Sequence, residues 1–304
     1  MHLTCRDRTL DVSRPVIMGV VNATPDSFSD GGELRDLDAR VARCVEMVEH
    51  GAGVLDIGGQ SAITGVPEIS VGEEIDRLVP VVAGLRAVSD VVISVDTYRP
   101  EVATAALDAG ADIINDISGV LDPALATVAA RYRAGFVLMH TRWRPKTRAD
   151  ANALYHETGG VVGDVVSFLV ERRQHLADAG ITDDQLILDP GPDFAKTAAQ
   201  TVDVLRALPA ITALGHPLLL ALSRKDFIGV ITQRAPKERL AGTLAAIAYC
   251  TTAAPHSILR VHDVREVREL LAVLDVLEGR SVIDPESGLA ADLRWQSRVA
   301  PSST

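Results

Sequence analysis

Eight short apolar stretches recur along this chain, and they limit its fold more than any other feature. Each is rich in Val, Ile and Leu, without the polar alternation of a strand that has one face in solvent. Continuous apolarity over such a length is typical of a parallel strand buried on both faces. The eight stretches are residues 15–22, 53–59, 91–96, 112–117, 134–140, 185–190, 217–223 and 257–263.

Helical patterns separate these stretches. Between the first two, Leu37, Val41, Cys44 and Val48 recur with the spacing of one helix face, and Gly51 follows them as a stop signal. Eight strand–helix units within residues 15–279 predict an α/β fold, the (β/α)8 TIM barrel. A doubly wound parallel sheet is the alternative, because periodicity alone does not report whether a sheet closes.

The domain organisation follows from the same pattern. No linker rich in Pro, Gly or Ser interrupts the strand–helix units, so we expect a single domain. Residues 1–14 are expected to form an N-terminal extension, residues 15–279 the barrel, and residues 280–304 a C-terminal tail.

Charge and composition exclude several classes of partner. The 30 Lys and Arg against 41 Asp and Glu give a net charge of −11, which argues against nucleic-acid or anionic-membrane binding but not against a locally basic pocket. We expect no signal peptide and no membrane span, because the N-terminus is charged and no long apolar run occurs. Cys5, Cys44 and Cys250 are widely spaced, so buried free thiols are expected. Together these features favour a cytoplasmic protein.

Polar residues end almost every apolar stretch. Because the carboxyl ends of barrel strands meet at one rim, we expect these residues to share a pocket. The set comprises Asn22, Asp56, Asp96, Asn115, Asp116, His140, Asp189, Ser223, Arg224, Lys225, Arg260 and His262.

The chemistry of this set divides in two. One group offers acceptors and amide donors suited to a heterocycle with ring N–H and amino groups. It consists of Asp56, Asp96, Asn115 and Asp189. The other group, Lys225, Arg260 and His262, offers donors suited to an oxyanion near the last strands. The pattern indicates a substrate in which an anionic group is attached to a flat nitrogen heterocycle.

Seven motifs in order along the chain are similar to those of one protein family. They are GVVNATPDSFSDGG (19–32), LDIGGQS (55–61), SVDTYRPEV (94–102), IINDISG (113–119), LDPG (188–191), SRKDFIG (223–229) and RVHDV (260–264). On these motifs the chain resembles the dihydropteroate synthases. The resemblance implies a pterin-binding (β/α)8 barrel that joins p-aminobenzoate to a dihydropterin methyl diphosphate and releases diphosphate, in folate synthesis.

The resemblance also implies roles for individual residues. It makes Asp96, Asn115, Asp189 and Lys225 the pterin contacts, and Asn22, Arg260 and His262 the diphosphate contacts. It places Mg²⁺ at Asn22, and it makes Lys225, Arg260 and His262 the catalytic residues. It further implies a homodimer through the last helices and a site that accepts a p-aminobenzoate-like or sulfonamide-like ligand.

One loop departs from the family pattern GGESTRPG. Residues 58–65 read GGQSAITG, so Ala62 and Ile63 replace the Thr–Arg pair that the resemblance places at the diphosphate and the arylamine. A charged hydrogen bond from arginine contributes ~1.5–3 kcal/mol, so its loss is expected to slow the reaction ~10–150-fold. Basic residues of the segment 141–152 are candidates to replace it, namely Arg142, Arg144, Lys146 and Arg148.

Two further departures fall on the same side. The family pattern DPGFGFGKT reads DPGPDFAKT here, with Pro192 and Asp193 in place of Phe and Gly. Asp226 stands where the family has a serine that receives the p-aminobenzoate carboxylate; a facing carboxylate at ~4 Å costs ~1–4 kcal/mol. The chain therefore resembles a divergent paralogue that keeps the pterin pocket and has weak or lost synthase activity. The alternatives are a fully active synthase and a non-catalytic pterin- or partner-binding protein.

Overall fold

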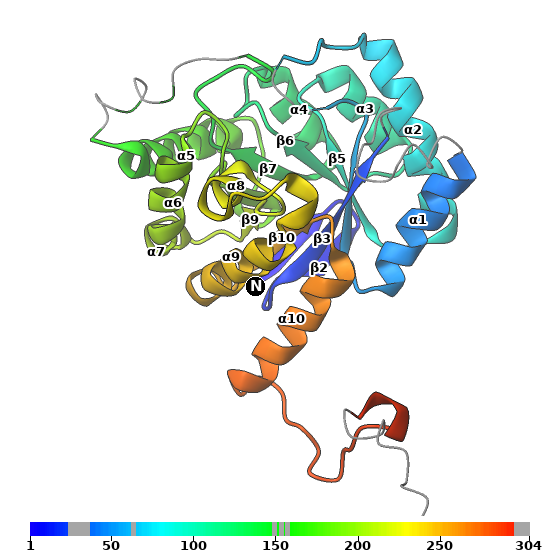
Figure 1. The fold of residues 1–304 in the computed structure, drawn as a ribbon. Helices are drawn as coiled ribbons and strands as arrows, with labels where there is room; N and C mark the ends of the chain where they lie inside the picture. The colour runs from blue at the N-terminus through cyan, green and yellow to red at the C-terminus, as the bar shows by residue number, and fades with distance from the viewer. Residues whose placement is uncertain (24–36, 62–64, 148–150, 152–154, 156–158, 295–304) are drawn as a thin grey trace, which may run out of the picture.

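Eight parallel strands close into a barrel with their helices outside it (Figure 1). This computed structural model describes residues 1–23, 37–61, 65–147, 151, 155 and 159–294. The strands are β3 (Val16–Asn22), β4 (Val54–Gly58), β5 (Val92–Asp96), β6 (Ile113–Asp116), β7 (Gly135–Met139), β8 (Leu186–Asp189), β9 (Leu218–Leu220) and β10 (Ser257–Val261). They pair in chain order, and β10 pairs with β3. The predicted (β/α)8 barrel is thereby confirmed, and all eight apolar stretches form its strands.

The helices cover the outside of the barrel. They are α1 (Leu37–Glu49), α2 (Val71–Val88), α3 (Pro100–Asp108), α4 (Pro123–Tyr132), α5 (Val161–Asp178), α6 (Ala198–Arg206), α7 (Leu208–Thr212), α8 (Asp226–Thr232), α9 (Leu240–Ala253) and α10 (Val264–Leu277). Local sequence explains their starts. Ser70 caps α2 by accepting the Glu73 N–H at 3.1 Å, and Pro100 occupies the first turn of α3, where its missing N–H costs nothing.

The inner surface of the barrel is apolar at the amino-terminal end of the strands. Because strand side chains alternate, every second residue points inward. One inward residue from each strand joins a single buried cluster: Met18, Val54, Val92, Ile113, Val137, Ile187, Leu219 and Ile258. A hairpin of β1 (His2–Cys5) and β2 (Arg8–Asp11) adds Leu3, Cys5 and Val12 to this cluster. The hairpin therefore plugs the amino-terminal end of the barrel and leaves the carboxyl-terminal end as the open one.

On five of the eight barrel strands, the inward position two residues further along is polar. Asp56, Ser94, Asn115, Asp189 and Arg260 occupy these positions. A further step of two reaches the rim, where Asn22 and Asp96 end their strands and His262 follows β10. The outward residues of the same strands, such as Leu55, Ile93 and Leu259, belong to the larger apolar core under the helices. The strand register alone thus gathers the predicted polar residues at one end.

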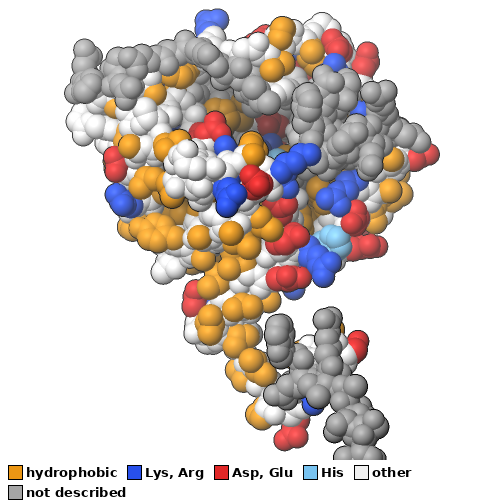
Figure 2. Space-filling view, in the orientation of Figure 1, with side chains coloured by type: hydrophobic (Ala, Val, Ile, Leu, Met, Phe, Trp, Pro, Cys, Tyr) orange, Lys and Arg blue, Asp and Glu red, His pale blue; other side chains and the backbone are white. Residues whose placement is uncertain are grey.

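Other sequence-based expectations can be compared with the structure. Cys5, Cys44 and Cys250 are buried and free, as predicted. Within the described residues no helix is both long and apolar enough to cross a membrane. Helix α10 protrudes from the barrel and carries exposed apolar side chains, including Val273 and Leu277 (Figure 2).

Candidate active site

A buried carboxylate organises the centre of the polar end. Asp56 on β4 accepts hydrogen bonds from Ser94 Oγ at 2.6 Å, from Asn115 Nδ2 at 3.1 Å and from Arg260 Nε at 2.7 Å. With these partners the carboxylate is fully engaged by the protein itself. The sequence grouped Asp56 with the ligand acceptors, but the structure shows it positioning Asn115 and Arg260.

Arg260 and Asp96 link opposite parts of the rim. Arg260 Nη2 donates to Asp96 Oδ2 at 3.0 Å, while its Nε remains on Asp56. Burial raises the pKa of Asp96 to about 7, although Arg260 acts in the opposite direction. Asn115 Oδ1 is buried and has no hydrogen-bond partner among the described residues. A ligand N–H would satisfy this oxygen, whose burial without a partner is otherwise costly.

Asp189 is held by the turn that follows β8. Its Oδ1 accepts the Gly191 N–H at 2.7 Å. Gly191 has φ +64°, and a Cβ there would lie 2.1 Å from His140 O, so the turn needs glycine on both counts. Burial raises the pKa of Asp189 to about 6, with Lys225 and Lys196 opposing the shift.

Lys225 lies at the start of α8, facing the loop that follows β8. Its Nζ is 4.3 Å from the centre of the Phe194 ring, a cation–π arrangement. Burial lowers the pKa of Lys225, while Asp193 and Asp189 act to raise it. The ammonium therefore connects the Asp189 side of the pocket with Phe194.

Asn22 ends β3, and His262 directly follows the neighbouring strand β10. His262 Nδ1 lies 3.0 Å from Ser223 Oγ, and the His262 N–H donates to the same oxygen at 3.3 Å. Burial, followed by Arg224 and Arg260, lowers the pKa of His262 to about 4, so the ring is neutral at pH 7. Asn22 ends β3 opposite Gly58. The neutral ring of His262 thus lies near the Arg260 guanidinium, and the Asn22 amide ends the strand next to β10.

The loop after β8 is fastened to α6 and α8 by Asp193. The Asp193 N–H donates to Thr201 Oγ1 at 3.0 Å, and the Thr201 hydroxyl donates back to Asp193 Oδ1 at 3.1 Å. Asp193 Oδ2 accepts the Phe227 N–H at 3.2 Å. Asp193 and Ala195 both adopt positive φ, 63° and 52°, at positions where the resembled pattern has glycine. The backbone here thus keeps a conformation typical of glycine, and Asp193 adds a carboxylate at one of the two positions.

The expected role of Asp226 is wrong. Its side chain is 87% exposed and pairs with Arg239 Nη1 at 2.8 Å. Arg224 pairs with Asp263 instead, at 2.6 Å. The carboxylate at the first-turn amides of α8 is Asp193, which is distant in sequence and therefore gave no local signal.

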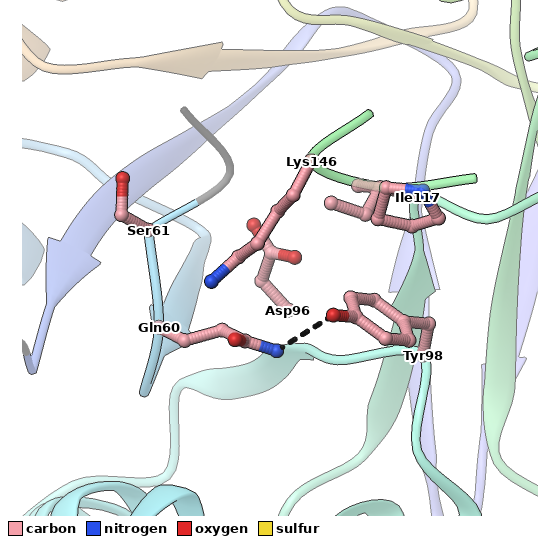
Figure 3. Close-up of a pocket in the computed structure, with 7 residues that line it drawn as sticks. Gln60, Ser61, Asp96, Tyr98, Ile117 and Lys146 are labelled. Carbon is pink, nitrogen blue, oxygen red and sulfur yellow. Dashed lines mark hydrogen bonds between the residues drawn. The ribbon is translucent and has the colours of Figure 1, made fainter. Parts of the chain in front are cut away.

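The basic segment after β7 contributes two cations with different partners. Arg142 Nε and Nη2 bind both oxygens of buried Asp164 on α5, at 2.8 and 2.7 Å, so this guanidinium is already engaged by the protein. Lys146 lines a small cavity directly beside Asp96. Its Nζ donates to Pro67 O at 3.1 Å and extends over Asp96 toward Gln60 (Figure 3). Ala62, Ile63 and Arg148 lie outside the described residues.

A buried lysine supports the pocket from behind. Lys196 Nζ contacts His140 Nδ1 at 2.8 Å and donates to Gly191 O at 2.9 Å and Phe194 O at 3.1 Å. Burial lowers the pKa of Lys196 to about 7. Lys196 was not among the predicted site residues. The signal available was a lysine inside a motif that otherwise makes a tight, largely apolar turn.

The geometry can be compared with proteins of known class. The family described as "Pterin binding enzyme" matches residues 18–262. The chain is 42% identical to dihydropteroate synthase from Synechocystis sp. over 266 aligned residues. The alignment covers 87% of this chain and 90% of the relative. It is 38% identical over 275 residues to the synthase from Escherichia coli (strain K12), with 90% and 96% of the two chains covered.

Solved structures give the same result. A structure of Xanthomonas albilineans dihydropteroate synthase with 4-aminobenzoic acid aligns with a TM-score of 0.83 at 40% identity, covering 91% of this chain and 98% of that one. A Yersinia pestis dihydropteroate synthase with a sulfonamide drug aligns with a TM-score of 0.85 at 37% identity, covering 92% and 100%. With the family matched from the first strand to the last and relatives aligned over most of their length, the chain belongs to the dihydropteroate synthase family of pterin-binding enzymes.

Proposed function

We propose that this protein binds a dihydropterin methyl diphosphate at the polar end of the barrel, and that its transfer to p-aminobenzoate is weak or lost. The observation that carries the first part is the buried group around Asp56, which presents Asn115, Asp96 and Arg260 to one space. Asn115 Oδ1 and the carboxylate of Asp189 are acceptors for the ring N–H and amino groups of a pterin, and Lys225 is a donor for its ring acceptors.

The diphosphate belongs on the β10–β3 side of this pocket. Arg260 and the neutral His262 donate to its oxygens, and Asn22 lies on the adjoining strand. The described residues include no group of three or more His, Cys, Asp or Glu that could hold a metal. A lone amide oxygen from Asn22 fits Mg²⁺, which keeps most of its waters and is commonly bound through substrate phosphates. When bound, Mg²⁺ would neutralise charge on the departing diphosphate.

The bond changes of the proposed reaction follow one order. The carbon–oxygen bond of the methyl diphosphate breaks, and its electron pair leaves with the diphosphate, whose charge Arg260 and His262 stabilise. The pterin methylene is left as a resonance-stabilised cation. The lone pair of the arylamine then forms the carbon–nitrogen bond, and the amine proton passes to water. No covalent nucleophile is required.

The acceptor side supports the second part of the proposal. Ile63 has no cation to offer a leaving group, and Lys146 is a lysine in a loop rather than an arginine fork. Structures of relatives hold 4-aminobenzoic acid or a sulfonamide. For this chain we propose the same class of small molecule, bound weakly because of Asp193 and Ile63.

The proposal also covers assembly and location. Tyr249 on α9 and Val273 and Leu277 on α10 are more than half exposed. Burial of these apolar side chains against a second copy would form a homodimer through the last helices. The net charge of −11 fits a cytoplasmic enzyme without nucleic-acid or membrane partners.

An assay separates the three functions. Purified protein is mixed with dihydropterin methyl diphosphate, Mg²⁺ and p-aminobenzoate, alongside the Escherichia coli enzyme. We expect pterin binding by calorimetry and turnover at least ~10-fold below that of the relative, from the lost arginine. Turnover equal to that of the relative would contradict the loss of transfer and establish a fully active synthase. Binding without any product would mean that transfer is lost and that the protein is a non-catalytic pterin-binding protein. Failure of the pterin to bind would contradict the proposal.

A further inference from the structure

The carboxylate of Asp193 accepts a backbone N–H at the start of α8, beside Lys225. The first-turn N–H groups of a helix have no partner within the helix, and at α8 one of them, from Phe227, is taken by Asp193 Oδ2. The other oxygen is held by the hydroxyl of Thr201, which is fully buried. Both oxygens are thus fixed, and the side chain is not a mobile group at the surface.

The same carboxylate acts on the cation beside it. Among the charges that raise the pKa of Lys225, Asp193 has the largest effect, ahead of Asp189. Phe194, the next residue along the chain, carries the Lys225 ammonium over its ring. Asp193 therefore takes one helix amide and a share of the Lys225 charge, two attractions for an anion at this corner.

We infer that Asp193 is a specificity-determining residue that disfavours acceptors with a carboxylate and favours neutral arylamines. The inference rests on the proposed function, in which an acceptor approaches the pterin methylene beside Lys225 and Phe194. A carboxylate entering this corner meets the fixed charge of Asp193 and finds the Phe227 N–H occupied. A neutral amide or unsubstituted ring meets neither penalty.

Affinities for a matched pair of ligands test the inference. Calorimetry measures 4-aminobenzoate and 4-aminobenzamide binding to the wild-type protein, Asp193→Asn and Asp193→Gly. Asparagine keeps an oxygen for Phe227 and tolerates positive φ, and glycine adopts that backbone freely. We expect either variant to bind 4-aminobenzoate at least ~10-fold more tightly than wild type, since a charge repulsion is removed. The affinity for 4-aminobenzamide should stay within ~3-fold.

Asp226→Asn is the matched control. It removes a negative charge from the same first turn of α8, but from a side chain that is 87% exposed and paired with Arg239. This variant should leave both affinities unchanged. The inference is overturned if neither Asp193 variant gains affinity for 4-aminobenzoate, or if Asp226→Asn gains as much. Dihydropterin methyl diphosphate binding is titrated separately on the same samples, so its failure would count against the proposed function and not against the arylamine comparison.

Discussion

The guanidinium of Arg260 reaches the carboxylate of Asp96 at 3.0 Å, although their strands, β10 and β5, are not neighbours in the barrel. The same guanidinium holds Asp56, on β4, at 2.7 Å. One cation thus balances two carboxylates from different strands at the mouth. Arg260 and these two carboxylates hold one another in place without any charge from a ligand.

Replacement of Arg260 should therefore destabilise the barrel as well as the site. Arg260→Met leaves Asp56 fully buried without its cation, and breaking a buried pair in this way costs about 3–5 kcal/mol. Urea unfolding measures the loss. Arg265→Met is the control, because Arg265 is 69% exposed and pairs with Glu269 on its own helix, a pair worth at most about 0.5 kcal/mol. Equal stability of the two variants would contradict this role for Arg260.

Pterin binding should strengthen as pH rises from 5 to 8. Burial raises the pKa of Asp96 to about 7 and that of Asp189 to about 6. Below those values each carboxyl is protonated and loses acceptor capacity, so affinity falls by up to about tenfold per pH unit for each group that must ionise. Above pH 8 the affinity should level off. Fluorescence titration of a dihydropterin across this range checks the sign, and a flat or inverted profile would exclude these groups as ligand acceptors.

Gly191 should not accept any side chain. A Cβ at this position would meet His140 O at 2.1 Å with φ at +64°, so Gly191→Ala must displace the turn that holds Asp189. We expect a loss of more than about 3 kcal/mol in unfolding free energy, together with lost pterin binding. Gly215→Ala separates strain from crowding, because Gly215 has φ +85° with nothing within 4 Å of its Cβ, and should cost only about 1–2 kcal/mol. Similar losses at the two positions would refute the crowding argument.

The barrel was predictable because its determinants are local. Strands buried on both faces leave unbroken apolar runs, and their alternation with helices fixes the class of fold. The polar ends were predictable as a group, since the ends of all barrel strands converge. The direction in which each side chain points was not predictable, because adjacent residues of a strand face opposite sides. Asn115 donates to Asp56 inside the barrel, whereas its neighbour Asp116 accepts the Ser118 N–H.

Contacts between loops could not be predicted from the sequence. Asp226 is next to Lys225 in the chain and was the obvious carboxylate at the start of α8, yet Asp193 lies there. That choice depends on a positive φ at Asp193 and on Thr201 one helix away. No periodic pattern reports such a placement, because it is decided by how two loops pack at the rim.

Lys146 should contribute to binding of the diphosphate but not of the pterin ring. Its Nζ donates to Pro67 O, and Lys146 lines the cavity beside Asp96 together with Gln60 and Ser61. Lys146→Met should weaken dihydropterin methyl diphosphate by about 5–10-fold, the cost of one partly exposed charged hydrogen bond. The corresponding dihydropterin alcohol, which lacks the diphosphate, should bind as before.

Arg144→Met removes a like charge from the same loop, and Arg144 does not line the cavity, so this control should leave both affinities unchanged. Calorimetric titration of the two ligands against the three proteins gives the comparison. Equal weakening of ester and alcohol would mean that Lys146 only holds the loop in place, whereas selective loss of the ester identifies it as the cation that partly replaces the missing arginine.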